Sequence, residues 1–369
     1  MAEMNQATAQ HLFEAGAVLI LLDVPYGTEI GINMNSWQAA ENFKGIKMIP
    51  PGLHFIYFSS CSSEGQLASR TGFFRYFRER EVVVRKWNSF VETFDPEITD
   101  EEELNRFIQN KKELDRYCGA FPYDSYKKWV SLSRHITTET TGRVLPTCGY
   151  IMSATALLSE CSNTASRASQ SKSASVPLNK MTADNLMPEM KENLDTVINY
   201  TSIDRFIEGS DSAMITKCAT DSELILNSVL ERCGSWQNVL AELQLSFLCF
   251  LIGQHFDSFD QWKKLVALLC GNQSSIYKYE DLYTELISVL HFQLKELPED
   301  FFVDIVSSNN FLTTTLHNLF ANISESTASA GLKSRAQKFS DHLTKHFGWD
   351  FDLEPEDCEP VVVDEFGNY

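Results

Sequence analysis

The sequence predicts a multidomain α+β protein, in which a compact β domain is followed by a helical domain. Three observations support this. Apolar runs of strand length crowd residues 17–87, helical spacing of apolar residues dominates the second half, and residues 153–175 hold eight serines. We therefore divide the chain into a β-rich domain with trailing helices (1–150), a Ser-rich flexible linker (151–190), a helical domain (191–348), and an acidic tail with a β-prone segment (349–369).

The clearest strand signal is a Pro-Pro-Gly turn, Pro50–Gly52, between two apolar runs at 45–49 and 53–58. Proline fixes φ at about −65°, and glycine accepts the positive φ that a tight reversal needs. Upstream, the continuous aliphatic run 17–24 is typical of a buried strand. We expect a β domain here, and none of its residues has the pattern of a catalyst.

A hairpin is predicted where residues 72–77 and 81–87 flank the charged reversal Arg78–Arg80. This stretch is also the main local concentration of basic residues, interleaved with aromatic ones. The basic residues are Arg75, Arg78, Arg80, Arg85 and Lys86, and the aromatic ones are Phe74, Tyr76, Phe77 and Trp87. Such interleaving serves single-stranded RNA in some proteins. The alternative is an amphipathic hairpin whose aromatic side chains face the core.

Helical spacing begins after residue 98. Thr99–Glu102 has the pattern of a capping box, and a second helix is expected over 125–136 with Tyr126, Trp129, Val130 and Ser133 on one side. Further apolar stripes follow in the second half. They are Trp236, Leu240, Leu243 and Phe247; Phe259, Trp262, Val266 and Leu269; Leu282, Leu286, Val289, Leu290, Leu294 and Leu297; Phe301, Phe302, Ile305 and Val306 behind Pro298; Phe311, Leu316, Leu319, Phe320 and Ile323; and Leu332, Ala336, Phe339, Leu343 and Phe347.

Composition narrows the function classes. The net charge of −19 argues against high-affinity binding of nucleic acid, because such binding depends on neutralising phosphates. Nine cysteines without a Cys-x-x-Cys pair fit a reducing compartment. The polar first ten residues do not resemble a signal peptide, and the longest apolar helical stretch, 245–252, is shorter than a membrane span. We expect a soluble intracellular protein without a membrane partner.

Motifs for chemistry are mostly missing. We find no phosphate-binding glycine loop, no dinucleotide fingerprint and no nucleophile elbow, so we expect no catalytic residue, cofactor or metal site. His342 and His346 have the spacing of zinc ligands, but the general-base Glu is absent, and a solvated basic face with Lys338 and Lys345 is the alternative. Trp37, Trp129 and Trp262 are either interface anchors or core residues, and their apolar surroundings favour the core.

The tail gives the sharpest signal for binding. An acidic run ends in the β-prone segment 360–366, and such a segment can add a strand to the sheet edge of a partner. The alternatives are a strand on its own first domain or a disordered end. The residues that would make the partner contact are Val361, Val362, Val363 and Phe366.

Blocks of residues, in order along nearly the whole chain, resemble the AAR-two splicing factor family, also called the a1-cistron splicing factor family. They do not extend over residues 150–190. The blocks are Val24–Ile32; Asn35–Trp37; Phe43–Gly45 leading into Lys47–Gly52; Phe121–Tyr123; Lys127–Trp129; Leu240–Gln244; Pro298–Val306; Asn310–Thr313; Pro355–Cys358; and Pro360–Val363.

The resemblance implies a β-sandwich-like N-terminal domain and a VHS-like helical domain. It also implies a non-enzymatic assembly factor in the biogenesis of the U-five small nuclear ribonucleoprotein, the U-five snRNP, and in pre-mRNA splicing. Members bind the scaffold protein pre-mRNA-processing factor eight through its RNase H-like and Jab/MPN domains, and they exclude the spliceosomal helicase until phosphorylation releases them. Because members bridge these domains with their C-terminal tail, the resemblance favours the partner interpretation of Val361–Val363 and Phe366.

The resemblance further implies a cytoplasmic and nuclear location. Two other functions stay open at this point. One is a direct RNA-binding splicing factor that uses the Arg75–Lys86 stretch, and the other is an uncharacterised hydrolase with a dispersed site.

Overall fold

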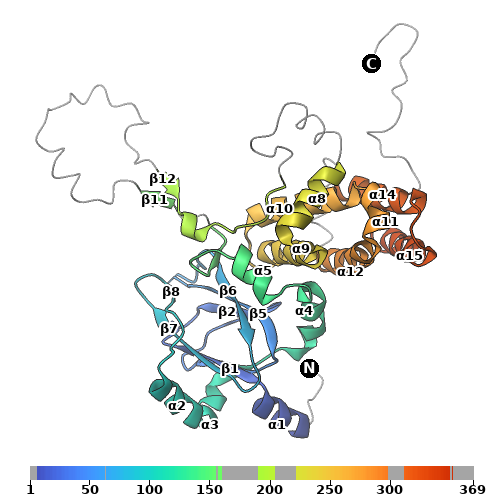
Figure 1. Ribbon diagram of the computed structural model, residues 1–369. Coiled ribbons are helices and arrows are strands. Elements are labelled where there is room, and N and C mark those ends of the chain that lie inside the picture. The colour runs from blue at the N-terminus through green and yellow to red at the C-terminus, as the bar shows by residue number, and fades with distance from the viewer. Residues whose placement is uncertain are drawn as a thin grey trace, which may run out of the picture. The chain divides into compact units, whose positions relative to one another are not determined.

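The computed structural model describes residues 6–62, 64–154, 157–159, 190–203, 222–297, 311–349 and 351 (Figure 1). The chain forms two compact units. The β unit comprises residues 1–125, 141–199 and 252–255, and the helical unit comprises residues 126–140, 200–251 and 256–369. The predicted fold class, a β domain followed by a helical domain, is confirmed.

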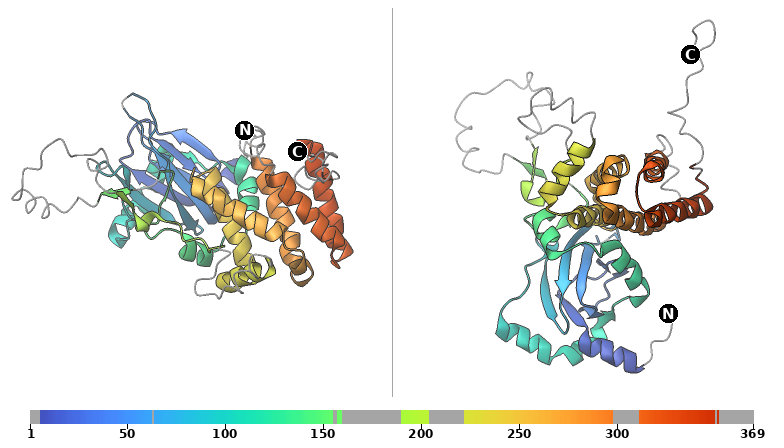
Figure 2. Two further views of the ribbon diagram at one scale, coloured as in Figure 1. Left: turned by 90° about the horizontal axis from the view of Figure 1, so that it is seen from above. Right: turned by 45° about the vertical axis from the view of Figure 1, so that its right-hand side comes forward.

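The described part of the β unit contains two five-stranded sheets and a small third one (Figure 2). In the first sheet the order is β8 (Thr93–Phe94), β7 (Val82–Asn88), β1 (Ala17–Leu22), β4 (Gly45–Ile49) and β9 (Cys118–Ala120). In the second it is β10 (Ile151–Met152), β6 (Thr71–Phe77), β5 (Gly52–Ser59), β2 (Glu29–Ile32) and β3 (Asn35–Gln38). The third pairs β11 (Leu157–Ser159) with β12 (Met190–Glu192).

The core of the β unit lies between the two large sheets. Phe58 of β5 in the second sheet packs edge-on against Trp87 of β7 in the first, with ring centroids 5.4 Å apart. Strand β1 is central in its sheet, between the parallel strand β7 and the antiparallel strand β4, which explains its uninterrupted aliphatic sequence. Strand β5 is central in the other sheet.

The Pro-Pro-Gly turn links β4 of the first sheet to β5 of the second, so the chain changes layers there. Gly52 adopts the expected positive φ, +127°. The predicted hairpin over residues 72–87 is wrong. Strand β6 pairs with β5, whereas β7 lies in the other sheet and pairs in parallel with β1. A short polar reversal looks the same in sequence whether it joins paired strands or turns the corner between two layers.

Helices cover the first sheet, namely α1 (Gln6–Ala15), α2 (Glu101–Gln109) and α3 (Lys111–Leu114). Leu104 and Phe107 of α2 pack on a cluster of buried strand residues that includes Val84. The cap differs from the prediction by one residue, because the Asp100 carboxylate accepts the backbone N–H of Glu103 at 3.3 Å. The short helix α5 spans Thr138–Val144.

In the helical unit, α9 (Trp236–Leu251) packs against α4, α8, α10 and α12, and its side chains from 238 to 250 are all buried. The other described helices of this unit are α4 (Tyr126–Ser133), α8 (Ser222–Cys233), α10 (Phe256–Cys270), α11 (Ser274–Lys278), α12 (Glu280–Glu296), α14 (Phe311–Glu325) and α15 (Ala330–Phe347). Helix α4 therefore belongs to this unit, although it lies within the first 150 residues. No described helix has the length and apolar character to cross a membrane.

The stripes predicted for these helices face the core. Trp129 and Ser133 of α4 are buried as predicted, but Val130 is 42% exposed, so its place on the buried side is wrong. The helix predicted to begin at Pro298 lies outside the described residues.

Buried polar side chains hold the helices around α9. Gln244 is fully buried, and its side-chain oxygen accepts the backbone N–H of His135 at 2.8 Å while its amide donates to the Ser131 carbonyl at 3.1 Å. Glu242 accepts the backbone N–H and the hydroxyl of Thr201 at 3.0 and 2.6 Å. A buried polar atom without a hydrogen-bond partner would destabilise the fold. These bonds therefore favour the one orientation of α9 in which Gln244 faces residues 131–135 and Glu242 faces Thr201.

Candidate functional site

The partner-binding residues predicted in the tail, Val361, Val362, Val363 and Phe366, lie outside the described residues. The candidate sites among the described residues are the basic stretch 75–86, the exposed tryptophan and the paired histidines.

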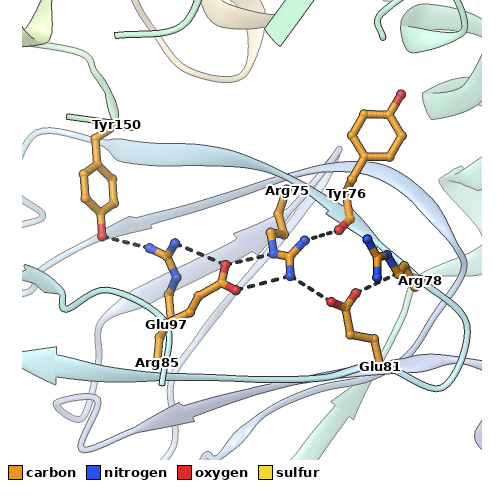
Figure 3. A network of polar contacts seen from close by, with 7 residues as sticks. All are labelled: Arg75, Tyr76, Arg78, Glu81, Arg85, Glu97 and Tyr150. Carbon is orange, nitrogen blue, oxygen red and sulfur yellow. Dashed lines mark hydrogen bonds and ion pairs between the residues drawn. The ribbon is translucent and has the colours of Figure 1, made fainter. Parts of the chain in front are cut away.

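The two best-placed arginines of the basic stretch are ion-paired within the chain. The guanidinium of Arg75, on β6, donates from Nε to Glu97 at 2.8 Å and from Nη2 to Glu81 at 2.9 Å. Arg85, on β7, donates to the Tyr150 hydroxyl at 3.0 Å and lies 3.4 Å from the same Glu97 carboxylate. Figure 3 shows Glu97 between the two guanidinium groups, so one carboxylate ties a strand of each sheet together.

In the rest of the stretch, Arg78 and Arg80 are exposed at the reversal, beside the exposed Glu79. Arg85 lies over the Phe73 ring, 4.0 Å from its centroid, and the neighbouring rings of Phe77 and Trp87 are buried. Lys86 is exposed and pairs weakly with Asp23 at 3.5 Å. Because Arg75 and Arg85 are matched by Glu81 and Glu97, this network carries no excess positive charge. Of the aromatic residues in the stretch, Phe77 and Trp87 are buried and Phe74 and Tyr76 are half-buried, which fits the core interpretation better than an open stacking surface.

Of the three tryptophans, Trp129 and Trp262 are buried in the helical unit, as expected, with 1% and 0% exposure. Trp37 is different. It is 44% exposed on β3, so the expectation that it packs inside is wrong. Strand β3 is the last described strand of the second sheet, and Ser36, Trp37 and Gln38 are all exposed along it.

Hydrogen bonds of the buried side chains of Asn33 and His54 hold the turn between β2 and β3. Asn33 adopts φ +55°, and its side-chain oxygen accepts the Phe55 backbone N–H at 3.1 Å. The His54 ring contacts the Pro50 carbonyl at 2.8 Å and the Asn33 amide at 2.9 Å. Since a carbonyl only accepts, Nε2 of His54 carries the hydrogen and Nδ1 accepts from Asn33.

That arrangement requires a neutral imidazole. Burial lowers the pKa of His54 to about 4, against the opposing effect of its bond to the Pro50 carbonyl. The ring therefore stays neutral at physiological pH, and its hydrogen bonds join the Pro-Pro-Gly corner to the β2–β3 turn. An exposed strand edge with a half-exposed tryptophan can accept a strand or a loop from another protein.

The paired histidines do not form a metal site with other described residues. The rings of His342 and His346 stack with centroids 5.8 Å apart, and His342 also lies 4.7 Å from His291 of α12. No group of three or more His, Cys, Asp and Glu side chains within the described ranges has the arrangement that holds a metal ion. His342, Lys338 and Lys345 are exposed, as expected for a solvated face.

Two family models match this chain. The model of the AAR2 N-terminal domain matches residues 15–146, and that of the AAR2 C-terminal repeat region matches residues 200–352. Together they cover both units, and no enzyme family is indicated by them. Residues 353–369 lie beyond both matched regions.

The relatives agree with the family models. The chain is 39% identical to the human and mouse proteins named Protein AAR2 homolog, over 98% of this chain and 97% of each relative. It is 36% identical to the Caenorhabditis elegans protein of the same name, over 93% of this chain and 97% of that one. The resemblance seen in the sequence blocks thus holds over nearly the full length.

Proposed function

This chain belongs to the AAR2 family, and from that premise we propose that it is a non-enzymatic assembly factor of the U-five small nuclear ribonucleoprotein. Membership of the family supports a role in pre-mRNA splicing. The finer proposal is that the chain binds the scaffold protein pre-mRNA-processing factor eight at its RNase H-like and Jab/MPN domains. It would hold off the spliceosomal helicase until it is released, in the cytoplasm and the nucleus.

The single observation that supports this proposal most is the match over both units and nearly the whole length of the AAR2 relatives. The surface features are consistent with a protein that binds protein. Arg75 and Arg85 of the basic stretch are paired with Glu81 and Glu97, which reduces their electrostatic attraction for RNA. The exposed edge strand β3 offers backbone groups and the Trp37 side chain instead.

Two contact regions follow from the proposal. The first is the tail segment with Val361, Val362, Val363 and Phe366, which would pair with a sheet edge of the scaffold protein. Alternating side chains of such a segment give it register, while its backbone gives affinity. The second is the β3 edge around Trp37, which would contact the same partner as a rigid platform.

The proposal is tested by capture from cell extract. The tagged full chain is used as bait, with and without nuclease, and bound proteins are identified by mass spectrometry. The proposal predicts that pre-mRNA-processing factor eight is recovered equally in both samples. Recovery of RNA-binding proteins that disappears with nuclease would favour a direct RNA-binding function, and failure to recover the scaffold protein in either sample would contradict the proposal.

A further inference from the structure

A small pocket with an apolar floor lies on the helical unit between α4 and α12. It has a volume of about 140 Å³, and its lining includes Leu132 and Phe292 together with Lys127, Lys128 and Lys295. The three lysines are exposed, whereas Leu132 is buried and Phe292 is half-buried, so the apolar pair forms the floor. Because a cavity of about 150 Å³ can hold a benzene ring, the pocket has room for one apolar side chain of a ligand.

The positive charge of this pocket continues along α12 towards α15, and the two helices lie side by side (Figure 1). Lys295 follows His291 by one helical turn, and the His291 ring lies 4.7 Å from that of His342 on α15. Burial lowers the pKa of His291, and the nearby His342 and Lys295 lower it further, which indicates a positive potential at this place. We call the continuous surface formed by Lys127, Lys128, His291, Lys295 and His342 the lysine–histidine surface.

The charges of the lysine–histidine surface are only partly balanced. Lys128 pairs with Glu296 at 3.1 Å, but the Lys128 side chain is 56% exposed. Within the part of the chain that the structure describes, Lys127 and Lys295 have no acidic partner at ion-pair distance. Further positive charge comes from Lys338 and Lys345, which are exposed on the same side of α15 as His342. On a chain with net charge −19, such a local excess of ammonium groups favours an acidic ligand.

The shape of the surface favours an acidic protein segment over RNA. Single-stranded RNA stacks its bases on open aromatic rings, whereas the Phe292 ring is half-buried and lies edge-on to His291 at 5.3 Å. The apolar floor instead fits an aliphatic or aromatic side chain next to carboxylates. A long polyanion would also extend beyond these lysines onto a chain of net charge −19, where its phosphates would be repelled. A short protein segment with a few carboxylates avoids this repulsion.

We propose that the lysine–histidine surface binds an acidic segment of a partner protein. Carboxylates of the segment pair with Lys127, Lys128 and Lys295, and one apolar side chain enters the pocket over Leu132 and Phe292. Since exposed ion pairs each contribute little, the affinity comes from several pairs together with the buried apolar side chain, and it depends on salt. The surface lies on other elements than the β3 edge, so it adds a contact beyond those of the proposed function.

The test is fluorescence anisotropy of the full chain with a labelled peptide in which six Glu residues flank a central Leu. We expect salt-sensitive binding that weakens at least tenfold in the double variant Lys127→Glu and Lys295→Glu. The control double variant Lys264→Glu and Lys278→Glu makes the same change of net charge at two exposed lysines of α10 and α11, and it should alter the affinity by no more than twofold. A peptide with Ser in place of the central Leu should bind at least threefold more weakly.

Three results would overturn the proposal. They are no binding of the peptide by the wild type, equal losses in the two double variants, and equal affinity for the Leu and Ser peptides. Stronger binding of a uridine oligonucleotide with the same number of charges would overturn it in favour of RNA. The variant Lys127→Arg and Lys295→Arg keeps both charges and should retain the affinity of the wild type within twofold. The melting temperatures of all variants verify that they are folded.

Discussion

Arg75 and Glu97 form a two-point contact, with Nε donating at 2.8 Å to one carboxylate oxygen and Nη2 at 3.2 Å to the other. Both side chains are about a quarter exposed, and the same carboxylate accepts from Arg85 on the facing sheet. Ion pairs of this kind contribute more than fully exposed ones, because the geometry is fixed and solvent screening is reduced. Two arginines that resemble part of an RNA-binding patch in the sequence thus form, with Glu97, an ion-pair link between the two sheets of the β unit.

The first prediction concerns the ion pairs of Glu97 with Arg75 and Arg85. Glu97→Gln removes the charge that both guanidinium groups share, and the free energy of unfolding should fall by about 1–2 kcal/mol. The control is Asp23→Asn, which breaks the exposed pair with Lys86 and should cost less than about 0.5 kcal/mol. Urea unfolding measures both. Equal losses in the two variants would mean that Glu97 has no special role.

A second prediction follows for RNA. The isolated protein should give no salt-sensitive complex with spliceosomal RNA in a gel shift at physiological ionic strength, since Arg75 and Arg85 are already paired. A micromolar complex that is lost in the double variant Arg75→Ala and Arg85→Ala would instead show that these pairs open for phosphates. The β unit would then have to be regarded as an RNA-binding module.

The third prediction is an acid-induced loss of stability that depends on His54. Its pKa is about 4 in the folded protein and about 6.5 in the unfolded chain, so the unfolded state binds more protons between these values. Stability should therefore decrease as the pH falls from 6.5 towards 4, by about 2–3 kcal/mol from this residue. Comparing the pH dependence of unfolding in the wild type and His54→Gln isolates the contribution. Similar slopes in the two proteins would contradict the depressed pKa.

The fourth prediction addresses the buried amide of α9. Gln244→Met keeps the side-chain size but leaves the His135 N–H and the Ser131 carbonyl without their side-chain partner. We expect a loss of about 1–3 kcal/mol, the cost of burying unsatisfied polar groups. Gln237→Met, an exposed position on the same helix, is the matched control and should be nearly neutral. Thermal unfolding distinguishes the two variants. A Gln244→Met variant as stable as the wild type would contradict a stabilising role for the hydrogen bonds of Gln244.

The fifth prediction separates interface from core among the tryptophans. Trp37→Ala should weaken binding to the scaffold protein at least tenfold while shifting the melting temperature by no more than about two degrees, because the side chain is half-exposed on the β3 edge. Trp262→Ala, by contrast, should cost about 3–5 kcal/mol of stability, because the ring is fully buried. Unchanged binding by Trp37→Ala would exclude the β3 edge from the interface.

Much of the fold could be predicted from local patterns, and the failures have physical causes. The apolar stripes of α9, α10 and α12 were sufficient to predict the helical core, since burial follows helical period. The sequence did not show that β6 and β7, on either side of the reversal 78–80, belong to different sheets. The parallel partner of β7 is β1, which lies some sixty residues earlier in the chain. The exposure of Trp37 was missed for the same reason, as strand order alone makes β3 an edge.

The candidate site was only partly visible in the sequence. The basic stretch was found, but the side-chain partners of Arg75 and Arg85 include Glu97 and Tyr150, which are brought there by the loop after β8 and the segment before β10. The role of His54 needed the positions of Asn33 and the Pro50 carbonyl, which no pattern shows. A local stretch of sequence shows the charge of its residues and the spacing of its apolar ones. It does not show contacts between residues that are far apart in the chain.

We propose that this chain binds pre-mRNA-processing factor eight through its tail and its folded surface. The most direct measurement is titration calorimetry with the purified RNase H-like and Jab/MPN domains, comparing the full chain with a variant that ends at residue 358. We expect a one-to-one complex with the full chain, at least tenfold weaker binding by the shortened one, and a melting temperature that changes by no more than one or two degrees. Absence of binding by the full chain, or a large fall in stability with unchanged affinity, would contradict it.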